Sequence, residues 1–228
     1  MSSAVIFDVD GTLVDSVDLH AESWQLAFAH FNIVVDFEEV RSQIGKGADQ
    51  LLPVFLSEKQ LKEQGKKIEK YKAELFEREY FSQVHAFPRV RSLLQRILAD
   101  GQQIALATSA KSDELERYKR IALIDDLVER QATSDDAEAS KPHPDIFLAA
   151  LDRLHGVSLD QVTVVGDTPH DARAANAAGL QMVGVLCGGF PEADLRNAGC
   201  IEIYLDPADL LAHYSQSLLA PAPLRKRA

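Results

Sequence analysis

The stretch AVIFDVDGTLVDS, residues 4–16, decides how this chain folds. Four apolar residues, 4–7, run directly into Asp8, and a second carboxylate, Asp10, follows two positions later. An unbroken apolar run with β-branched and aromatic side chains is typical of a strand covered on both faces. In an open α/β sheet, functional side chains gather just beyond the carboxyl ends of such strands. We therefore expect Asp8 at that edge and Asp10 in the turn that follows.

Asp8 and Asp10 repel each other, so together in the ionised form they need a cation or a shared proton. An alternative is purely structural, with Asp10 capping backbone amides in an Asp-Gly turn. The stretch also resembles the first signature of the haloacid dehalogenase-like hydrolases, DxDGTLxDS, which is complete from Asp8 to Ser16. The resemblance implies that Asp8 is a nucleophile, that Asp10 is a general acid and base, and that Mg²⁺ is the cofactor.

Composition excludes several classes of protein. A chain of 228 residues can hold one core domain and a smaller accessory domain. The net charge of −11 argues against a nucleic-acid partner. No apolar stretch reaches about 18 residues and no leader-like segment opens the chain, so we expect a cytoplasmic protein without a membrane partner. Cys187 and Cys200 are expected to be reduced, partly buried thiols.

The sequence changes its period after the first strand. Residues 14–31 have the apolar spacing of a helix, residues 37–44 form a short helix candidate that stops at Gly45, and residues 59–81 form a long charged one. This predicts an all-helical cap domain, residues 17–85, inserted into a core domain made of residues 1–16 and 86–228. The return hinge is expected near residues 85–88.

Strands and helices alternate in the second half of the chain. Strands are expected at residues 103–108, 127–132, 162–165, 182–186 and 201–205. Helices are expected at residues 89–100, 113–121, 144–154, 171–178 and 207–219. Such alternation predicts an α/β fold with a doubly wound parallel sheet, a Rossmann-like core. The tail from Ala220 is expected to be frayed.

Two further polar loops follow predicted strands or begin helices. Thr108 and Ser109 follow the apolar strand IALA, where a hydroxyl and an amide could donate to a phosphate, although capping a helix is the commoner role. Lys141 stands in SKPHPD, a loop fixed by two prolines. Most lysines beside proline are simply solvated, but a rigidly placed cation suits a phosphoryl group.

The last polar loop contains Asp167 and Asp171, four residues apart, directly after a buried strand. This pair suits an oxygen-ligated cation such as Mg²⁺. The structural alternative is strand-end capping by the first carboxylate and favourable helix N-terminal charge from the second. His170 has no partner at a useful spacing, and we expect it at the surface.

The joint occurrence of these loops strengthens the resemblance, which covers about residues 4–190. KPxPD and GDxxxD occur in the order of the family, and the cap insertion resembles phosphoglycolate phosphatases and β-phosphoglucomutases. By this resemblance, Asp8 attacks phosphorus and forms an aspartyl-phosphate. Thr108 and Lys141 hold the phosphoryl oxygens. The metal is held by Asp8, the Asp10 carbonyl and Asp167, with Asp171 close behind.

The expected substrate is a small phosphorylated metabolite chosen by the cap. The expected contacts are Ser109, His20, Trp24 and the loop Gly45-Lys46-Gly47, for which a plain helix break is an equal alternative.

The main rival is a phosphosugar mutase. His20 and Trp24 match positions in β-phosphoglucomutases, but Ala48 stands where those enzymes carry arginine, and Gly166 precedes Asp167 where they have glutamate. Dehalogenase activity is disfavoured because it needs neither Asp10 nor a metal. The intact set of Asp8, Asp10, Lys141 and Asp167 argues against a non-enzymatic binding protein on a degenerate scaffold.

Overall fold

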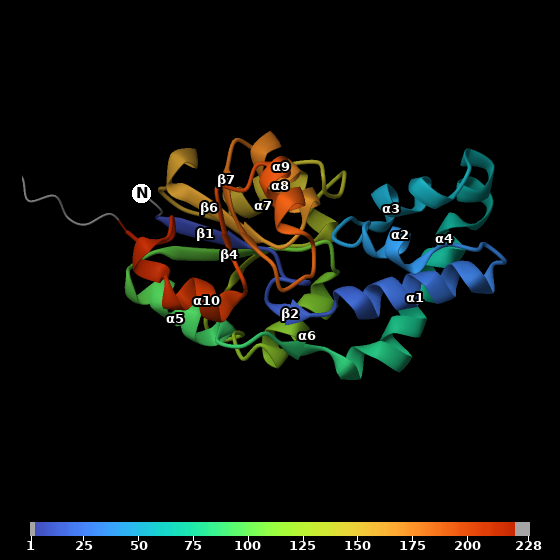
Figure 1. The fold of residues 1–228 in the computed structure, drawn as a ribbon, viewed down its shortest axis with the longest axis horizontal. Coiled ribbons are helices and arrows are strands. Elements are labelled where there is room, and N and C mark those ends of the chain that lie inside the picture. The colour runs from blue at the N-terminus through green and yellow to red at the C-terminus, as the bar shows by residue number, and fades with distance from the viewer. Residues whose placement is uncertain (1–2, 222–228) are drawn as a thin grey trace, which may run out of the picture.

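A six-stranded parallel sheet forms the centre of the computed structural model, which describes residues 3–221. The strands are β1 (Ala4–Phe7), β4 (Gln103–Ala107), β5 (Arg130–Ala132), β6 (Val162–Gly166), β7 (Gln181–Val185) and β8 (Glu202–Tyr204). Their order is β5-β4-β1-β6-β7-β8, with β1 between β4 and β6 (Figure 1). All the strands are parallel, so their carboxyl ends share one edge, and the predicted doubly wound α/β fold is confirmed.

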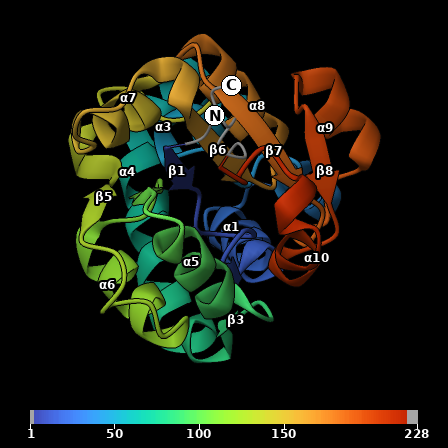
Figure 2. The ribbon, with the colours of Figure 1, turned by 90° about the vertical axis from the view of Figure 1, so that its left-hand side faces the viewer.

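Helices cover both faces of the sheet because the central strand buries alternate side chains on opposite sides. Val5 and Phe7 of β1 belong to one apolar core, and Ala4 and Ile6 to the other. The first core is covered by α5 (Val90–Ala99), α6 (Ser112–Ile121) and α10 (Pro207–Ala212), the second by α7 (Asp145–Asp152), α8 (Pro169–Ala177) and α9 (Glu192–Ala198) (Figures 1 and 2). Burying one Val, Ile or Phe side chain contributes about 1.5–3 kcal/mol, so β1 anchors both layers.

Residues 17–85, which we call the helical insert, lie beyond the carboxyl edge of the sheet, on the right of Figure 1. The insert contains α1 (Val17–His30), α2 (Phe37–Arg41), α3 (Ala48–Phe55) and α4 (Glu58–Leu75). These helices share an apolar cluster of their own that includes Phe28, Leu51 and Ile68. The cluster is consistent with the predicted cap domain, whose boundaries stay a prediction.

The two chain segments that connect the insert to the core pair with each other. β2 (Val14–Asp15) and β3 (His85–Ala86) form a short antiparallel ladder in which Val14 lies opposite Ala86. The prediction that the first helix begins at Val14 is therefore wrong. The reason is that a partner about 70 residues away leaves no trace in the local apolar period.

Several element boundaries also differ from the sequence prediction. The long helix predicted to residue 81 ends at Leu75, and a π-helical turn (Phe76–Tyr80) and a 3₁₀ turn (Phe81–Gln83) follow, because Phe76 and Phe81 turn inward to stack on His20 and Tyr118. The strand predicted at 127–132 is only β5, and the last helix ends at Ala212.

Helices α3 and α9 were not predicted, and α3 is hidden by Pro53, a residue usually excluded from helix interiors. Of the predicted frayed tail, residues 222–228 lie outside the described range. Within residues 3–221, no helix is both long enough and apolar enough to span a bilayer. Both cysteines are free thiols, as predicted; Cys187 is half-buried, whereas Cys200 is buried more fully than expected.

Candidate active site

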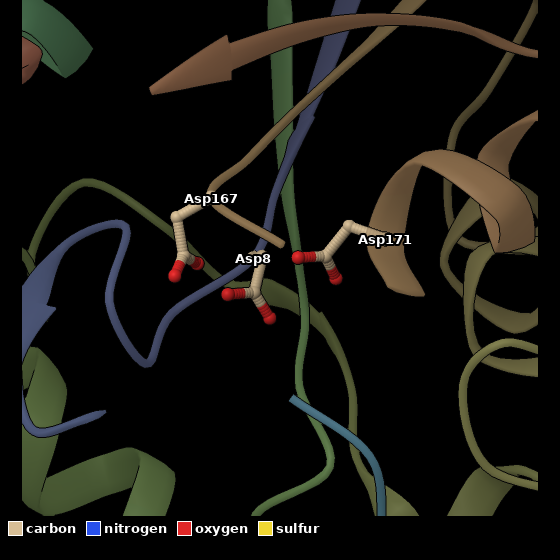
Figure 3. Close-up of side chains that lie close together, drawn as sticks. All are labelled: Asp8, Asp167 and Asp171. Carbon is tan, nitrogen blue, oxygen red and sulfur yellow. The ribbon is translucent and has the colours of Figure 1, made fainter. Parts of the chain in front are cut away.

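Three carboxylates meet at the carboxyl edge of the sheet. Asp8 follows β1, Asp167 follows β6, and Asp171 lies in the first turn of α8; all three are buried. Their carboxylate oxygens lie within 4.8 Å of one another, and Figure 3 shows the three groups gathered in one space. The sequence prediction that the first and last polar loops meet here agrees with this geometry.

Lys141 supplies a positive charge to this cluster. Its side chain is 1% exposed, and its Nζ atom lies 2.5 Å from Asp8 Oδ1, 2.7 Å from Asp171 Oδ1 and 3.3 Å from the carbonyl oxygen of Ala107. Burial alone would lower the pKa of Lys141, but the charges of Asp171 and Asp8 raise it above its usual value. The lysine is therefore charged, and it is buried with full pairing.

One lysine does not balance three carboxylates. Burial, only partly offset by the Lys141 ammonium group, raises the pKa of Asp8 to about 7. Burial and the charges of Asp8 and Asp171 raise the pKa of Asp167 well above its usual range. Lys141 therefore offsets only part of the cost of burying these carboxylates together.

The donor atoms fit a hard divalent cation. Asp167 Oδ1 accepts a hydrogen bond from Thr12 Oγ1 at 2.9 Å, but its Oδ2 atom is buried and has no hydrogen-bond partner within residues 3–221. By contrast, Asp171 pairs through Oδ1 with Lys141, and its Oδ2 accepts from the amide and hydroxyl of Thr168 at 3.0 and 2.6 Å. A buried carboxylate oxygen without a partner, beside a second carboxylate, is the kind of donor that Mg²⁺ requires.

The carboxylate of Asp10 belongs to a separate group of contacts. Its Oδ1 atom accepts from Ser16 Oγ at 2.7 Å and lies 3.1 Å from His20 Nε2, while Oδ2 accepts from Thr108 Oγ1 at 3.4 Å. Burial would raise the pKa of Asp10, but hydrogen bonds from His20 and Ser16 and the His20 charge lower it to about 2. The carboxylate therefore lies beside the cluster of three rather than in it.

A cavity of about 740 Å³ separates the insert from this edge of the sheet. Its lining contains eight of the residues predicted for the site: Asp8, Asp10, His20, Trp24, Gly45, Lys46, Gly47 and Ser109. Thr108 is fully buried, and its hydroxyl also accepts from the amide of Ala110 at 3.0 Å. This contact lies in the loop before α6 and does not cap the helix, whose N-cap residue is Lys111.

Comparison with known proteins identifies the family. The sequence profile of the haloacid dehalogenase-like hydrolases matches residues 5–185. This chain belongs to that family. A phosphoglycolate phosphatase from Yersinia pestis is 31% identical over 221 residues, which are 95% of this chain and 91% of the relative. A phosphorylated carbohydrates phosphatase from Thermotoga maritima is 28% identical over 210 residues, covering 91% and 96% of the two chains.

Solved structures agree with this assignment. A hydrolase from Pseudomonas syringae superimposes with a TM-score of 0.86 at 30% identity and covers 94% of this chain and 99% of that one. This haloacid dehalogenase-like hydrolase is thus an enzyme, a phosphoric monoester hydrolase.

Two residues of this hydrolase that contact His20 beside Asp10 were not predicted from the sequence. His20 Nδ1 lies 2.8 Å from Lys72 Nζ, and His20 Nε2 lies 3.2 Å from the hydroxyl of Tyr118. Lys72 follows Ile68 by four residues and lies on the same inner face of α4. A lysine on an apolar helix face was therefore the sequence signal that could have identified it. Tyr118 is 98 positions from His20, and no local pattern connects them.

The prediction that His170 lies at the surface is wrong. The side chain is 5% exposed, and its Nε2 atom lies 2.9 Å from the carbonyl oxygen of Ser42. It is buried because the end of α2 in the hydrolase lies over the N-terminus of α8, a long-range contact that the spacing of residues could not show.

Proposed function

We propose that this hydrolase is a Mg²⁺-dependent phosphatase that acts on a small phosphorylated metabolite through an aspartyl-phosphate on Asp8. The observation that carries the proposal is the Lys141 ammonium group, 2.5 Å from Asp8 and 2.7 Å from Asp171, beside an oxygen of Asp167 that no described residue hydrogen-bonds. The strand-end carboxylate of Asp8, which lines the cavity, then lies beside a fixed cation and a metal-type donor that are buried behind it. A cytoplasmic location is part of the proposal.

The chemistry divides into two steps at Asp8. A carboxylate oxygen of Asp8 attacks phosphorus, the bond from phosphorus to the leaving oxygen breaks, and Asp10 gives that oxygen a proton. Water then attacks the phosphorus of the aspartyl-phosphate, Asp10 takes a proton from this water, and the Asp8 carboxylate and inorganic phosphate are released. Both carboxylates line the cavity in which the substrate would bind.

The low pKa of Asp10 places a condition on the first step. A carboxyl group with a pKa of about 2 carries no proton at neutral pH. Acting as an acid therefore requires that substrate binding weakens the hydrogen bonds from His20 and Ser16. Both donors belong to the connection into the insert or to α1, so movement of the insert would change them.

Residues of the core domain would bind the negatively charged phosphoryl oxygens. Lys141, Thr108 and Ser109 would hold these oxygens, and Asp171 keeps the lysine charged and in place. Mg²⁺, held by Asp8, the Asp10 carbonyl and Asp167 with Asp171 close behind, would offset the negative charge of the phosphoryl group. In the insert, His20, Trp24, Lys46 and Gly47 line the cavity and would select the leaving group.

A panel of phosphorylated metabolites tests the proposal. Wild-type protein with Mg²⁺ is expected to release inorganic phosphate from at least one small phosphomonoester. Asp8→Asn is expected to be inactive, and Asp113→Asn, an exposed acidic position at the start of α6, is expected to be fully active. If the folded protein binds phosphate esters but never releases phosphate, it is a binding protein rather than a phosphatase.

A further inference from the structure

The segment of residues 45–49, which consists of the loop before α3 and the first two residues of that helix, packs against the carboxyl edge of the sheet. Ser109 Oγ donates to the carbonyl oxygen of Gly45 at 3.4 Å. A Cβ atom on Gly45 would lie only 2.8 Å from Thr168 Cγ2, in the loop that follows β6. The loop of the insert is therefore seated on two of the polar loops of the core.

The same loop contacts the segment that carries Lys141. Asp49 Oδ2 accepts a hydrogen bond from the backbone amide of Ser140 at 3.1 Å, and the Ser140 hydroxyl donates to the same carboxylate. A Cβ atom on Gly47 would lie 2.1 Å from Ser140 Oγ, so a glycine is needed for this close approach. Burial opposes it, but hydrogen bonds from Ser140 and Gln50 lower the pKa of Asp49, which is therefore ionised at neutral pH.

A second carboxylate holds this segment from the core side. Asp145, in the first turn of α7, accepts from the amide of Ala139 through Oδ2 at 3.1 Å. The two successive amides before Lys141 are thus each bound by a carboxylate, one from the core and one from the insert. Lys141, whose Nζ atom lies between Asp8 and Asp171, follows these two amides directly in the chain.

We propose that Asp49 is a positioning residue for Lys141: by accepting hydrogen bonds from Ser140 when the insert is seated, it fixes the lysine in the geometry that holds the transferred phosphoryl group. The effect on turnover rests on the proposed phosphatase function; the contact itself does not. Because the bond crosses from the insert to the core, the insert influences the chemical step as well as the choice of substrate.

Two other roles for Asp49 lead to different results. In the first alternative, Asp49 is an acidic residue in the first turn of α3 whose sole role is to stabilise that helix through the helix dipole. In the second alternative, Asp49 lines the cavity and its sole role is to contact the leaving group of the substrate. A role in the helix would lower stability without changing turnover, and a contact with the leaving group would matter for some substrates and not for others.

Steady-state kinetics with p-nitrophenyl phosphate and phenyl phosphate separate these roles. Asp49→Ala is expected to lower kcat about tenfold to a hundredfold for both esters, because small misplacement of a positioned group costs this much. Asp49→Asn keeps an acceptor oxygen and is expected to retain kcat within about threefold. Asp36→Ala is the matched control: Asp36 caps α2 of the insert by accepting from Glu38 and Glu39, and it should leave kcat unchanged.

An unchanged kcat in Asp49→Ala, an equal loss in Asp49→Asn, or a loss for one ester only would overturn the proposal. Amide hydrogen exchange gives a readout without turnover: peptides that contain residues 139–141 should exchange faster in Asp49→Ala than in wild type or Asp36→Ala. If wild type hydrolyses neither ester, the proposed function fails at these substrates while exchange still tests the contact. Equal exchange rates of these peptides in Asp49→Ala and wild type would contradict the positioning role itself.

Discussion

Gly188 lies so close to Asp167 that a Cβ atom on the glycine would stand 1.7 Å from Asp167 Oδ2. Gly11 approaches the same oxygen from another loop, and its Cβ atom would lie 2.3 Å away. This oxygen is buried and has no hydrogen-bond partner among the described residues. Two glycines therefore shape the space around the donor that is best suited to a cation, although neither glycine bears a chemical group of its own.

We expect Gly188→Ala to weaken Mg²⁺ binding by about tenfold or more, as loss of a group that orients a metal ligand does. The added methyl group must push the Asp167 carboxylate or the loop aside. The measurement is the Mg²⁺ concentration for half-maximal activity. Gly184→Ala in β7 is the control, because its Cβ atom would come no closer than 3.3 Å to Cys200 Sγ. Equal Mg²⁺ requirements in the two variants would contradict the prediction.

Mg²⁺ should stabilise the wild-type fold. A ligand that binds only the native state adds about 2.7 kcal/mol at a hundred times its Kd. Here the effect has a specific source, since the cation would relieve the repulsion among Asp8, Asp167 and Asp171. We expect Mg²⁺ to raise Tm in wild type, and to raise it far less in Asp167→Ala, at matched ionic strength. Full activity in excess EDTA would exclude the metal role.

Replacing the nucleophile should abolish turnover and leave the fold intact. Asp8→Asn has the same shape, and loss of a covalent nucleophile costs about 10⁴-fold or more in kcat. Circular dichroism and the melting transition would confirm folding, and phosphate release would measure the loss. Near-normal activity in a folded Asp8→Asn protein would remove Asp8 from the mechanism.

The same variant gives a prediction about pH. The pKa of Asp8 rises from 3.8 to about 7 on folding without metal, so the native state binds the proton more tightly than the unfolded state. The stability that this group contributes is full below about pH 4 and is lost as the pH rises through about 7. Measured by urea unfolding in EDTA, wild type should therefore lose stability relative to Asp8→Asn across this interval. A constant difference between the two proteins would contradict the prediction.

The sequence predicted the part of the site that follows from strand order alone. Asp8, Asp167 and Asp171 each follow or border a buried strand, and parallel strands bring such positions to one edge. Lys141 was predicted from a short signature in a loop stiffened by prolines. Where a residue sits at a strand end, the fold class is sufficient to place it.

The residues that were missed depend on contacts between distant segments. Tyr118 reaches His20 from α6, His170 is covered by the end of α2, and Ser140 meets Asp49 where the insert touches the core. The apolar period describes which face of a helix is buried but not which element buries it. These contacts depend on how the insert sits against the core, and no local pattern contains that information.

The fate of the phosphoryl group distinguishes a phosphatase from a mutase. Both would use Asp8, Asp10 and Mg²⁺, so the difference lies in which nucleophile next reaches the aspartyl-phosphate. A mutase must keep water out until a second sugar hydroxyl arrives, and this requires tight closure by cations directed at the distal phosphate. In this chain the insert places Ala48, a residue without charge, in the cavity wall beside Lys46.

The ammonium group of Lys46 is already bound within the insert, because its Nζ atom donates to Gln43 Oε1 at 2.5 Å. Water should therefore compete successfully for the aspartyl-phosphate. We expect net release of inorganic phosphate from small phosphomonoesters without any need for a bisphosphate activator. The measurement is phosphate release together with product analysis for glucose 1-phosphate, with Asp8→Asn as the control for contaminating activity. Rapid conversion to glucose 6-phosphate with negligible free phosphate would instead establish a mutase, because the intermediate would then be shielded from water until the sugar returned.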